Sequence, residues 1–306
     1  MNKKAFIYII IAGMLWGTSG LFVDVLTPLG FSSLQMTAVR ATVSFLCFLT
    51  YVLIFKRGAF RAKKGQIFLF LAHGGSIFAT AYCYFTSMQM TSVATAVVLM
   101  YTAPIFVTVF SVIFLGEKLN SLKVISIALM IVGCCLVSGV IGGFAFDPLG
   151  ILIGFMSGIC YSAYNIITKI EMRRGCDPIS TSTYGFLFMM IIGCSICKPW
   201  EIVSLTSSVW IVLLLIALGV VTTVLPYFFY TLAMRDMAAG TASSLSIVEP
   251  LAATLFGIVF LSQTPEKPCV IGIVIIVAAI FLLGIAENKN KHNEVCEAKV
   301  EKGEEK

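Results

Sequence analysis

Three ionisable side chains, Arg40, His73 and Glu249, lie within long apolar stretches of the sequence. A charge in such surroundings is costly unless a partner or water compensates it. A carboxyl group there is stable either when protonated or when ionised beside water or a cation. These residue types therefore suit the binding of a polar small molecule or the carriage of a proton.

Three prolines within the same apolar stretches predict kinks in helices. Proline has no N–H to donate and pushes against the carbonyl four residues earlier, so that this carbonyl loses its helical partner. In a membrane, such a group must be satisfied by other parts of the protein or by a watered cavity. The prolines are Pro104, Pro226 and Pro250, and the carbonyls that they free are those of Met100, Thr222 and Ser246.

Glu249 is next to Pro250, and Tyr101 comes three residues before Pro104. We expect Glu249 to contact a solute or to carry a coupling proton, with Tyr101 as a wall of the same site. Three further aromatic residues are candidates for this site: Trp16, Tyr161 and Tyr230. The alternative is structural, with Glu249 as a protonated, hydrogen-bonded group and the aromatic residues as packing.

Arg40 is expected to face a polar cavity or a carboxylate, because a charge inside the bilayer costs about 2.5–3.5 kcal/mol on insertion scales. Asp24 is the nearest carboxylate by depth. In the alternative, the Arg40 side chain reaches the outer headgroups, about 12 Å away at about 1.5 Å per residue. For His73, a hydrogen bond between helices is the alternative to a role in proton transfer.

The elements that must position these residues are membrane helices. Hydrophobic residues make up 59% of the chain and charged residues only 12%, whereas a soluble domain has about 25% charged residues. A crossing helix needs about 20 apolar residues, and strands of a membrane barrel would alternate instead. We predict an all-α integral membrane protein with ten transmembrane helices, at 5–26, 33–55, 66–87, 92–115, 121–141, 149–170, 178–197, 208–232, 239–261 and 268–286.

The sequence contains an internal duplication. The segment Ser92–Lys118 returns 146 residues later as Ala238–Thr264, with Pro104 aligned on Pro250 without a gap. Because each half has five predicted spans, the second half enters the membrane from the opposite side, and such inverted repeats place a site near mid-membrane. We assign residues 1–143 to the first repeat, 144–287 to the second and 288–306 to a disordered cytoplasmic tail.

The positive charges predict the orientation of the ten spans. If the N-terminus is cytoplasmic, all but three of the 21 Lys and Arg residues fall on the cytoplasmic side, the exceptions being Arg40, Lys198 and Lys267. Lys and Arg favour cytoplasmic loops, so both termini are predicted to be cytoplasmic. The net charge of +6 then reflects this topology and does not indicate nucleic acid as a partner.

The chain resembles the EamA branch of the drug/metabolite transporter superfamily over residues 5–286. The resemblance is carried by Trp16-Gly17, Arg40, the tract AVVLMYTAPIFVTVFSVIFLGEKL and its echo SIVEPLAATLFGIVFL. It implies a ten-helix secondary transporter of the inner membrane, commonly an exporter of amino acids or other small metabolites. One departure is that the first copy ends in Leu115-Gly116-Glu117, whereas the second reads Leu261-Ser262-Gln263.

Other function classes lack their sequence signals. The chain has no Walker motif, HExxH-like pair or zinc-ligand cluster, so we expect no enzyme activity, cofactor or metal. The expected partners are a small-molecule solute and membrane lipid, with protons as a candidate coupling ion. The alternatives are a membrane scaffold or receptor, a membrane-embedded enzyme, and a nucleotide-sugar-type carrier. A single buried Arg suits the last poorly, because its substrate carries a doubly charged phosphate.

Overall fold

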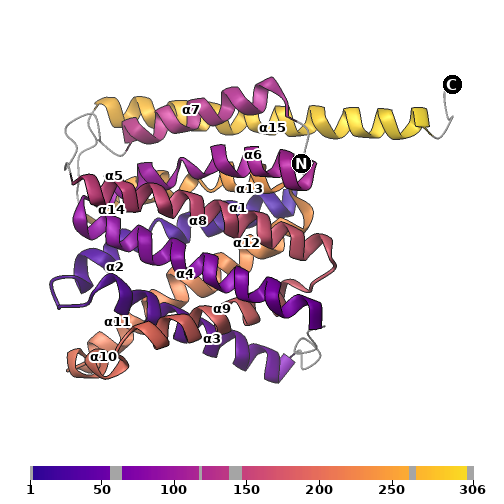
Figure 1. Cartoon of the computed structure of the whole chain (residues 1–306). Helices are drawn as coiled ribbons and strands as arrows, with labels where there is room; N and C mark the ends of the chain where they lie inside the picture. Colours follow the sequence, from indigo (N-terminus) through magenta and orange to yellow (C-terminus); the bar gives the residue numbers. More distant parts are fainter. Residues whose placement is uncertain (1–2, 56–63, 117–118, 138–146, 262–266, 302–306) are drawn as a thin grey trace.

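The computed structural model describes residues 3–55, 64–116, 119–137, 147–261 and 267–301, and these residues contain helices and no β-strand. The α-helices are α1 (Lys3–Trp16), α2 (Ser19–Leu26), α3 (Ser33–Phe55), α4 (Ile67–Met90), α5 (Val93–Met100), α6 (Ala103–Leu115), α7 (Ser121–Val137), α8 (Pro148–Arg173), α9 (Pro178–Ile196), α10 (Pro199–Leu205), α11 (Val209–Gly219), α12 (Leu225–Asp236), α13 (Ala239–Leu245), α14 (Val248–Leu261) and α15 (Lys267–Glu301). Most of them run along one common direction in an elongated bundle (Figure 1).

Eight segments among the described residues are long and apolar enough to cross a membrane. They are Lys3–Leu26, Ser33–Phe55, Ile67–Met90, Thr95–Leu115, Pro148–Arg173, Pro178–Ile196, Val209–Asp236 and Lys267–Ala286. The helix α7 has 17 residues, the lower end of the range for a crossing helix. The ninth predicted span is divided between α13 and α14. The all-helical membrane class is thus confirmed, whereas the count of ten spans stays a prediction.

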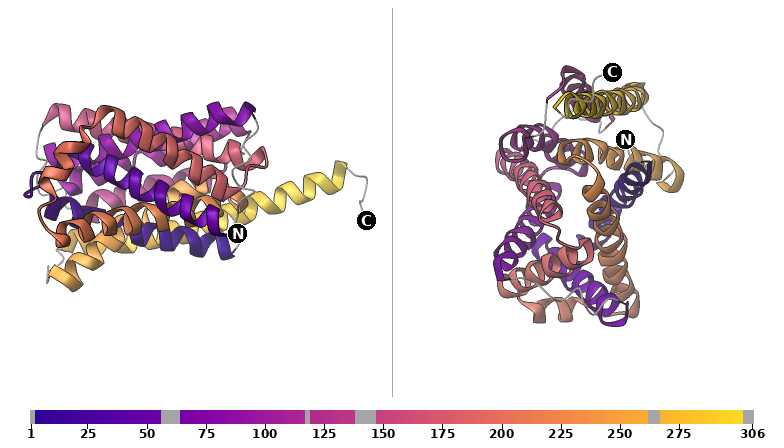
Figure 2. Two further views of the ribbon diagram at one scale, coloured as in Figure 1. Left: turned by 90° about the horizontal axis from the view of Figure 1, so that it is seen from below. Right: turned by 90° about the vertical axis from the view of Figure 1, so that its right-hand side faces the viewer.

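Helices from the two halves of the chain interleave. The helix α4 packs against α8 and α9, α3 packs against α9, and α1 packs against α12 and α14. The pair α7 and α15 pack on each other at one flank of the bundle, as the end-on view in Figure 2 shows. The core between the halves is therefore built from both repeats, which is where an inverted repeat is expected to hold its site.

The predicted kinks appear as breaks or distortions of the helices. The break between α5 and α6 lies at Tyr101–Thr102, with Pro104 in the first turn of α6. A second break separates α13 from α14 just before Pro250. A π-helical turn, Val220–Val224, precedes Pro226 at the start of α12. Each distortion lies where proline removes a helical hydrogen bond.

A further break at 17–18 separates α1 from α2 and was not predicted. A Cβ at Gly17 would lie 2.8 Å from both the Ala252 Cβ and the Glu249 carbonyl oxygen. Only glycine allows α1 to approach the backbone of α14 so closely. The break between α1 and α2 therefore packs directly against the start of α14, which carries Glu249.

The C-terminal segment is helical over the residues that the structure describes. The helix α15 continues past the apolar segment to Glu301 and leaves the bundle as a straight extension (Figure 1), where the sequence predicted a disordered tail from residue 288. Lys, Glu and Ala have high helix propensity, and extending an existing helix avoids the cost of nucleating a new one. The exact boundaries of the two repeats remain a prediction.

Candidate functional site

A small cavity lies between the two repeats, next to the broken helices. Its volume, measured as the space open to the centre of a water-sized sphere, is about 30 Å³, which is more than the about 10–15 Å³ that one water needs. It is lined by Trp16, Ser19, Arg40, Thr80, Ala81, Tyr84, Met100, Tyr161, Tyr227 and Glu249. The cavity therefore brings a buried carboxyl group and a buried guanidinium group together with aromatic side chains, and it has room for water.

Glu249 lies in the first turn of α14, and its side chain is only 4% exposed. The Tyr84 hydroxyl donates to Oε1 at 2.9 Å, and the Tyr101 hydroxyl lies 2.9 Å from Oε2. Both tyrosines come from the first repeat, whereas Glu249 belongs to the second. Burial of this carboxyl group is thus offset by two hydrogen bonds that cross the interface between the repeats.

Tyr101 also contacts a backbone carbonyl at the break before Pro250. Its hydroxyl lies 2.5 Å from the Ser246 carbonyl oxygen, the acceptor to which Pro250 cannot donate. The Tyr161 hydroxyl lies 3.3 Å from the Ser246 Oγ atom. The Ser246 carbonyl also accepts from the Glu249 N–H at 2.9 Å. The break in the first repeat therefore adds a second hydrogen-bond donor to the break in the second.

Arg40 is buried, with 4% of its surface exposed, and is held by two residues of the π-helical turn. Its Nε atom donates to the Thr223 hydroxyl at 2.7 Å, and its Nη2 atom donates to the Thr222 carbonyl at 3.1 Å. That carbonyl is the one freed by Pro226. The guanidinium carbon also lies 4.7 Å from the centre of the Phe85 ring, a cation–π distance.

The expectation of a polar cavity for Arg40 fits this geometry, but the partner suggested by sequence is wrong. Asp24 is exposed, whereas the guanidinium group is bonded to the π-helical turn in the interior. Depth along two consecutive spans did not reveal this, because the partners lie on a helix distant in sequence. The hydrogen bonds with Thr222 and Thr223 also hold the side chain inward, away from the headgroups.

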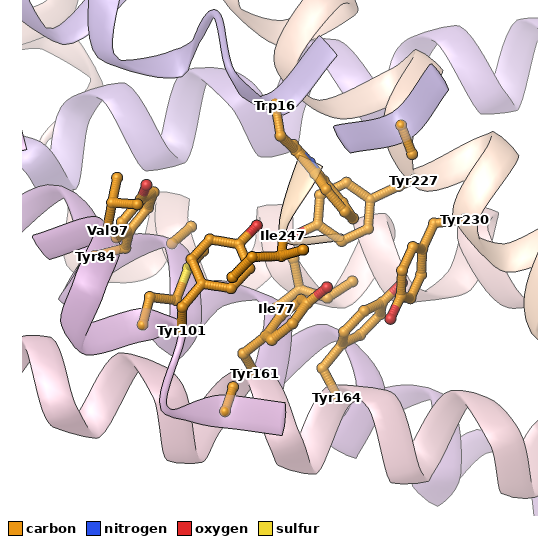
Figure 3. Packing of buried hydrophobic residues seen from close by; sticks show 14 of the residues in the cluster. Trp16, Ile77, Tyr84, Val97, Tyr101, Tyr161, Tyr164, Tyr227, Tyr230 and Ile247 are labelled. Atoms are coloured by element: carbon orange, nitrogen blue, oxygen red, sulfur yellow. The ribbon is translucent and has the colours of Figure 1, made fainter. Parts of the chain in front are cut away.

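A cluster of aromatic rings forms one wall of the cavity (Figure 3). The Trp16 ring lies 5.2 Å from the rings of both Tyr227 and Tyr230 and 6.4 Å from that of Tyr161, measured between centroids. Such tilted and edge-to-face contacts stabilise aromatic pairs. Tyr230 lies behind the cavity lining, and its hydroxyl donates to the side-chain Oδ1 atom of Asn165.

The structure brings most of the candidate residues together. Trp16, Arg40, Tyr161 and Glu249 line the cavity, Tyr101 binds Glu249, and Tyr230 packs behind Trp16. Sequence reasoning missed several lining residues: Ser19, Thr80, Tyr84 and Tyr227. The duplication contained a signal for Tyr84, because that residue lies 146 positions before Tyr230. Among the described residues, no group of three His, Cys, Asp or Glu side chains could hold a metal ion.

Comparison with known proteins identifies the family. The model of the EamA-like transporter family matches the chain twice, at residues 3–139 and 148–285. The chain belongs to this family. The two matches confirm the duplication seen in the sequence and place the protein in the drug/metabolite transporter superfamily.

Named relatives of this EamA protein are transporters. An uncharacterised transporter of Archaeoglobus fulgidus is 27% identical over 274 residues, covering 90% of this chain and 94% of the relative. The threonine/homoserine exporter RhtA of Salmonella typhimurium is 25% identical over 248 residues, covering 80% and 79%. A solved crystal structure matches with a TM-score of 0.76 at 19% identity, over 94% of this chain and 99% of that one, which shows a shared fold.

Proposed function

We propose that this EamA protein is a secondary active transporter that exports small metabolites, with amino acids as the first candidates, by alternating access around the central cavity. One observation carries the proposal. Glu249 of the second repeat is bound by Tyr84 and Tyr101 of the first, in a cavity that also contains Arg40. Rocking of the repeats would exchange these hydrogen bonds for bonds to a solute.

The chemistry of the cavity suits a zwitterion. A guanidinium group binds a carboxylate strongly, and a carboxylate binds an ammonium group by charge-assisted hydrogen bonds. Arg40 and Glu249 would supply these two groups, and Trp16, Tyr161 and Tyr227 would contact the remainder of the solute. The name of RhtA, a threonine/homoserine exporter, supports amino acids as a substrate class.

The hydrogen bonds also support a proton at Glu249 in this closed conformation. A phenol has one hydrogen to donate, yet Tyr101 lies within hydrogen-bond distance of both Ser246 and Glu249. Both contacts are hydrogen bonds when Tyr101 donates to Ser246 and a protonated Glu249 donates to Tyr101. Binding of a cationic group would displace this proton, which makes proton-coupled exchange the natural mechanism.

The other function classes fit less well. A scaffold or receptor has no need of a buried acid and base at the junction of two repeats. A membrane-embedded enzyme would need clustered catalytic groups, and among the described residues the cavity holds one acid and one guanidinium group. Membrane location follows from the apolar helices, and we propose the inner membrane with both termini cytoplasmic.

Solute flux in proteoliposomes tests the proposal. The purified protein is first screened for stabilisation by amino acids, nucleosides and cationic drugs, because a ligand that binds the folded state raises its apparent stability. The stabilising compound is then used in radiolabelled counterflow, with protein-free liposomes as the control. Saturable exchange of an amino acid is the expected result. Stabilisation without exchange would favour a receptor, and exchange of phosphorylated nucleosides alone would favour the nucleotide-sugar alternative.

A further inference from the structure

A second pair of ionisable side chains is buried outside the central cavity. His73 of α4 and Glu171 of α8 are 1% and 0% exposed, and the His73 Nδ1 atom lies 2.7 Å from the Glu171 Oε2 atom. Neither residue lines the cavity. The functional role proposed for Glu249 therefore leaves this pair unexplained.

The pair lies where α8 is fastened to three other helices at the side predicted to be cytoplasmic. Near it, the Lys169 ammonium group donates to the Met234 and Met237 carbonyls at the end of α12, at 2.9 and 2.6 Å. Arg173 donates to the Leu115 carbonyl at the end of α6 at 2.6 Å. With the bond from Glu171 to α4, these contacts hold this end of the bundle closed.

The surroundings of the pair are tightly packed and incompletely hydrogen-bonded. Gly185 of α9 leaves no room for a Cβ beside the His73 ring, so the ring is fixed in place. The Glu171 Oε1 atom and the Tyr164 hydroxyl are buried without a hydrogen-bond partner among the described residues. An unpaired carboxylate oxygen is costly in such a place, and the cost is smaller when the carboxyl group is neutral or its charge is compensated.

Other titratable groups lie near the pair, and they make different contacts. From α8, the Tyr164 ring stands edge-on to His73, with centroids 5.2 Å apart. From α9, Tyr184 neighbours Gly185 and stacks on Phe70. The Lys169 and Arg173 cations bind backbone carbonyls. Other ionisable side chains on α4, on α8 and on the helices that pack against them include Tyr82, Cys83 and Tyr84 of α4, Cys160 and Tyr161 of α8, Arg40, Cys47 and Tyr51 of α3, Cys194 of α9, and Tyr227, Tyr230, Arg235 and Asp236 of α12.

We propose that His73 and Glu171 together form a proton-binding site, distinct from the central cavity, that keeps the cytoplasmic side closed while it holds its proton. With that proton, the pair has no net charge, either as imidazolium and carboxylate or as imidazole and carboxylic acid. Without it, one negative charge remains in a water-excluded place, which is strongly unfavourable. Separation of α4 from α8 would hydrate that charge, so loss of the proton opens this side.

The pair joins the two repeats, with His73 in the first and Glu171 in the second, and it has no symmetry-related counterpart. At offsets of 145 and 146 residues, His73 corresponds to Leu218 or Gly219, and Glu171 corresponds to Leu26 or Val25. The opposite side of the protein therefore has no equivalent proton site, and only one of the two closures responds to pH. This inference rests on the proposed function insofar as closure is part of an alternating-access cycle.

Accessibility of a single cysteine tests the site without any solute. Ile77 is buried one turn from His73 along α4, so Ile77→Cys in a cysteine-free chain reports opening of this side. A membrane-impermeant maleimide is applied to the cytoplasmic face of inside-out vesicles. The matched control carries His73→Gln and Glu171→Gln, which can keep a hydrogen bond but have no proton to lose. The ratio of the two rates cancels the ionisation of the introduced thiol.

The expected result is a rise of about tenfold in this ratio as the pH is raised over the range in which the protein stays folded, because loss of the pair's proton opens this side. A ratio that is independent of pH overturns the proposal. Because the double variant could fail to fold, ¹⁵N NMR of histidine gives a second test. The chain has two histidines, so His292→Gln leaves His73 as the only signal. A ring signal that does not change over the same pH range would also overturn it.

These tests separate the inference from the proposed function. If cysteine accessibility depends on pH but no amino acid is exchanged, the proton site stands and the transport proposal fails. If exchange occurs while accessibility and the NMR signal do not change with pH, the transporter stands and the proton site fails.

Discussion

Replacement of Glu249 by Gln tests the hydrogen-bond arrangement at the junction of the repeats. In the protonated arrangement, Glu249 accepts from Tyr84 and donates to Tyr101, which donates to the Ser246 carbonyl. A Gln carboxamide can make the same two hydrogen bonds, because its oxygen accepts and its nitrogen donates. Glu249→Gln should therefore mimic the protonated protein and keep the closed conformation.

The magnitudes follow from the number of hydrogen bonds affected. Glu249→Gln keeps both bonds, so we expect a stability change below about 1 kcal/mol, less than one typical hydrogen bond. Glu249→Ala leaves the buried Tyr84 hydroxyl without its acceptor and should cost about 1–3 kcal/mol. Loss of a charged partner for an ammonium group should weaken solute binding by about 1–2 kcal/mol in either variant, a factor of about 5–30.

Three measurements on purified protein check this reasoning. Thermal unfolding in detergent should rank wild type and Glu249→Gln above Glu249→Ala. Equilibrium solute binding should be weaker in Glu249→Gln, and it should lose its pH dependence if Glu249 carries the coupling proton while exchange stays measurable. If Glu249 only binds the solute, affinity should fall at every pH. Wild-type affinity, rate and pH profile in Glu249→Gln would refute the reasoning and make the residue structural.

Three other predictions follow from the structure and the charge distribution. Arg40→Ala should impair transport more than Arg40→Lys with expression roughly kept, because Lys retains a cation; wild-type flux in Arg40→Ala would remove Arg40 from the site. Gly74→Ala should destabilise the protein by about 1–3 kcal/mol by overpacking against α9. Gly75→Ala is the control, because its Cβ would meet its nearest atom at 3.8 Å, and it should have little effect in the same thermal assay. Equal effects of the two variants would contradict the packing argument. A cysteine introduced at Ala62, which lies outside the described residues, should react only with reagent added from the cytoplasmic side, and labelling from outside would reverse the topology.

Much of the fold could be predicted because membrane helices are encoded locally. The apolar stretches, the duplicated tract with Pro104 and Pro250, and the family resemblance all lie in contiguous sequence. The breaks before these prolines followed from the missing N–H group alone. The break at Gly17 did not, because it depends on how closely α14 approaches α1. The helical extension of α15 was also missed, since its Lys- and Glu-rich composition is compatible with both a helix and a disordered tail.

The apolar pattern and the duplicated tract were enough to give the class of protein, its two repeats and the position of Glu249 beside a kink. Tertiary structure decided which groups meet. The partner of Arg40 is a carbonyl 182 residues away, and the partner of His73 is a carboxyl group 98 residues away; both depend on how α3 and α4 pack against the second repeat. Hydropathy and helical period specify that a helix crosses the membrane and where it bends. They do not specify which neighbour its polar side chains face, because that depends on rotation and contact between helices distant in sequence.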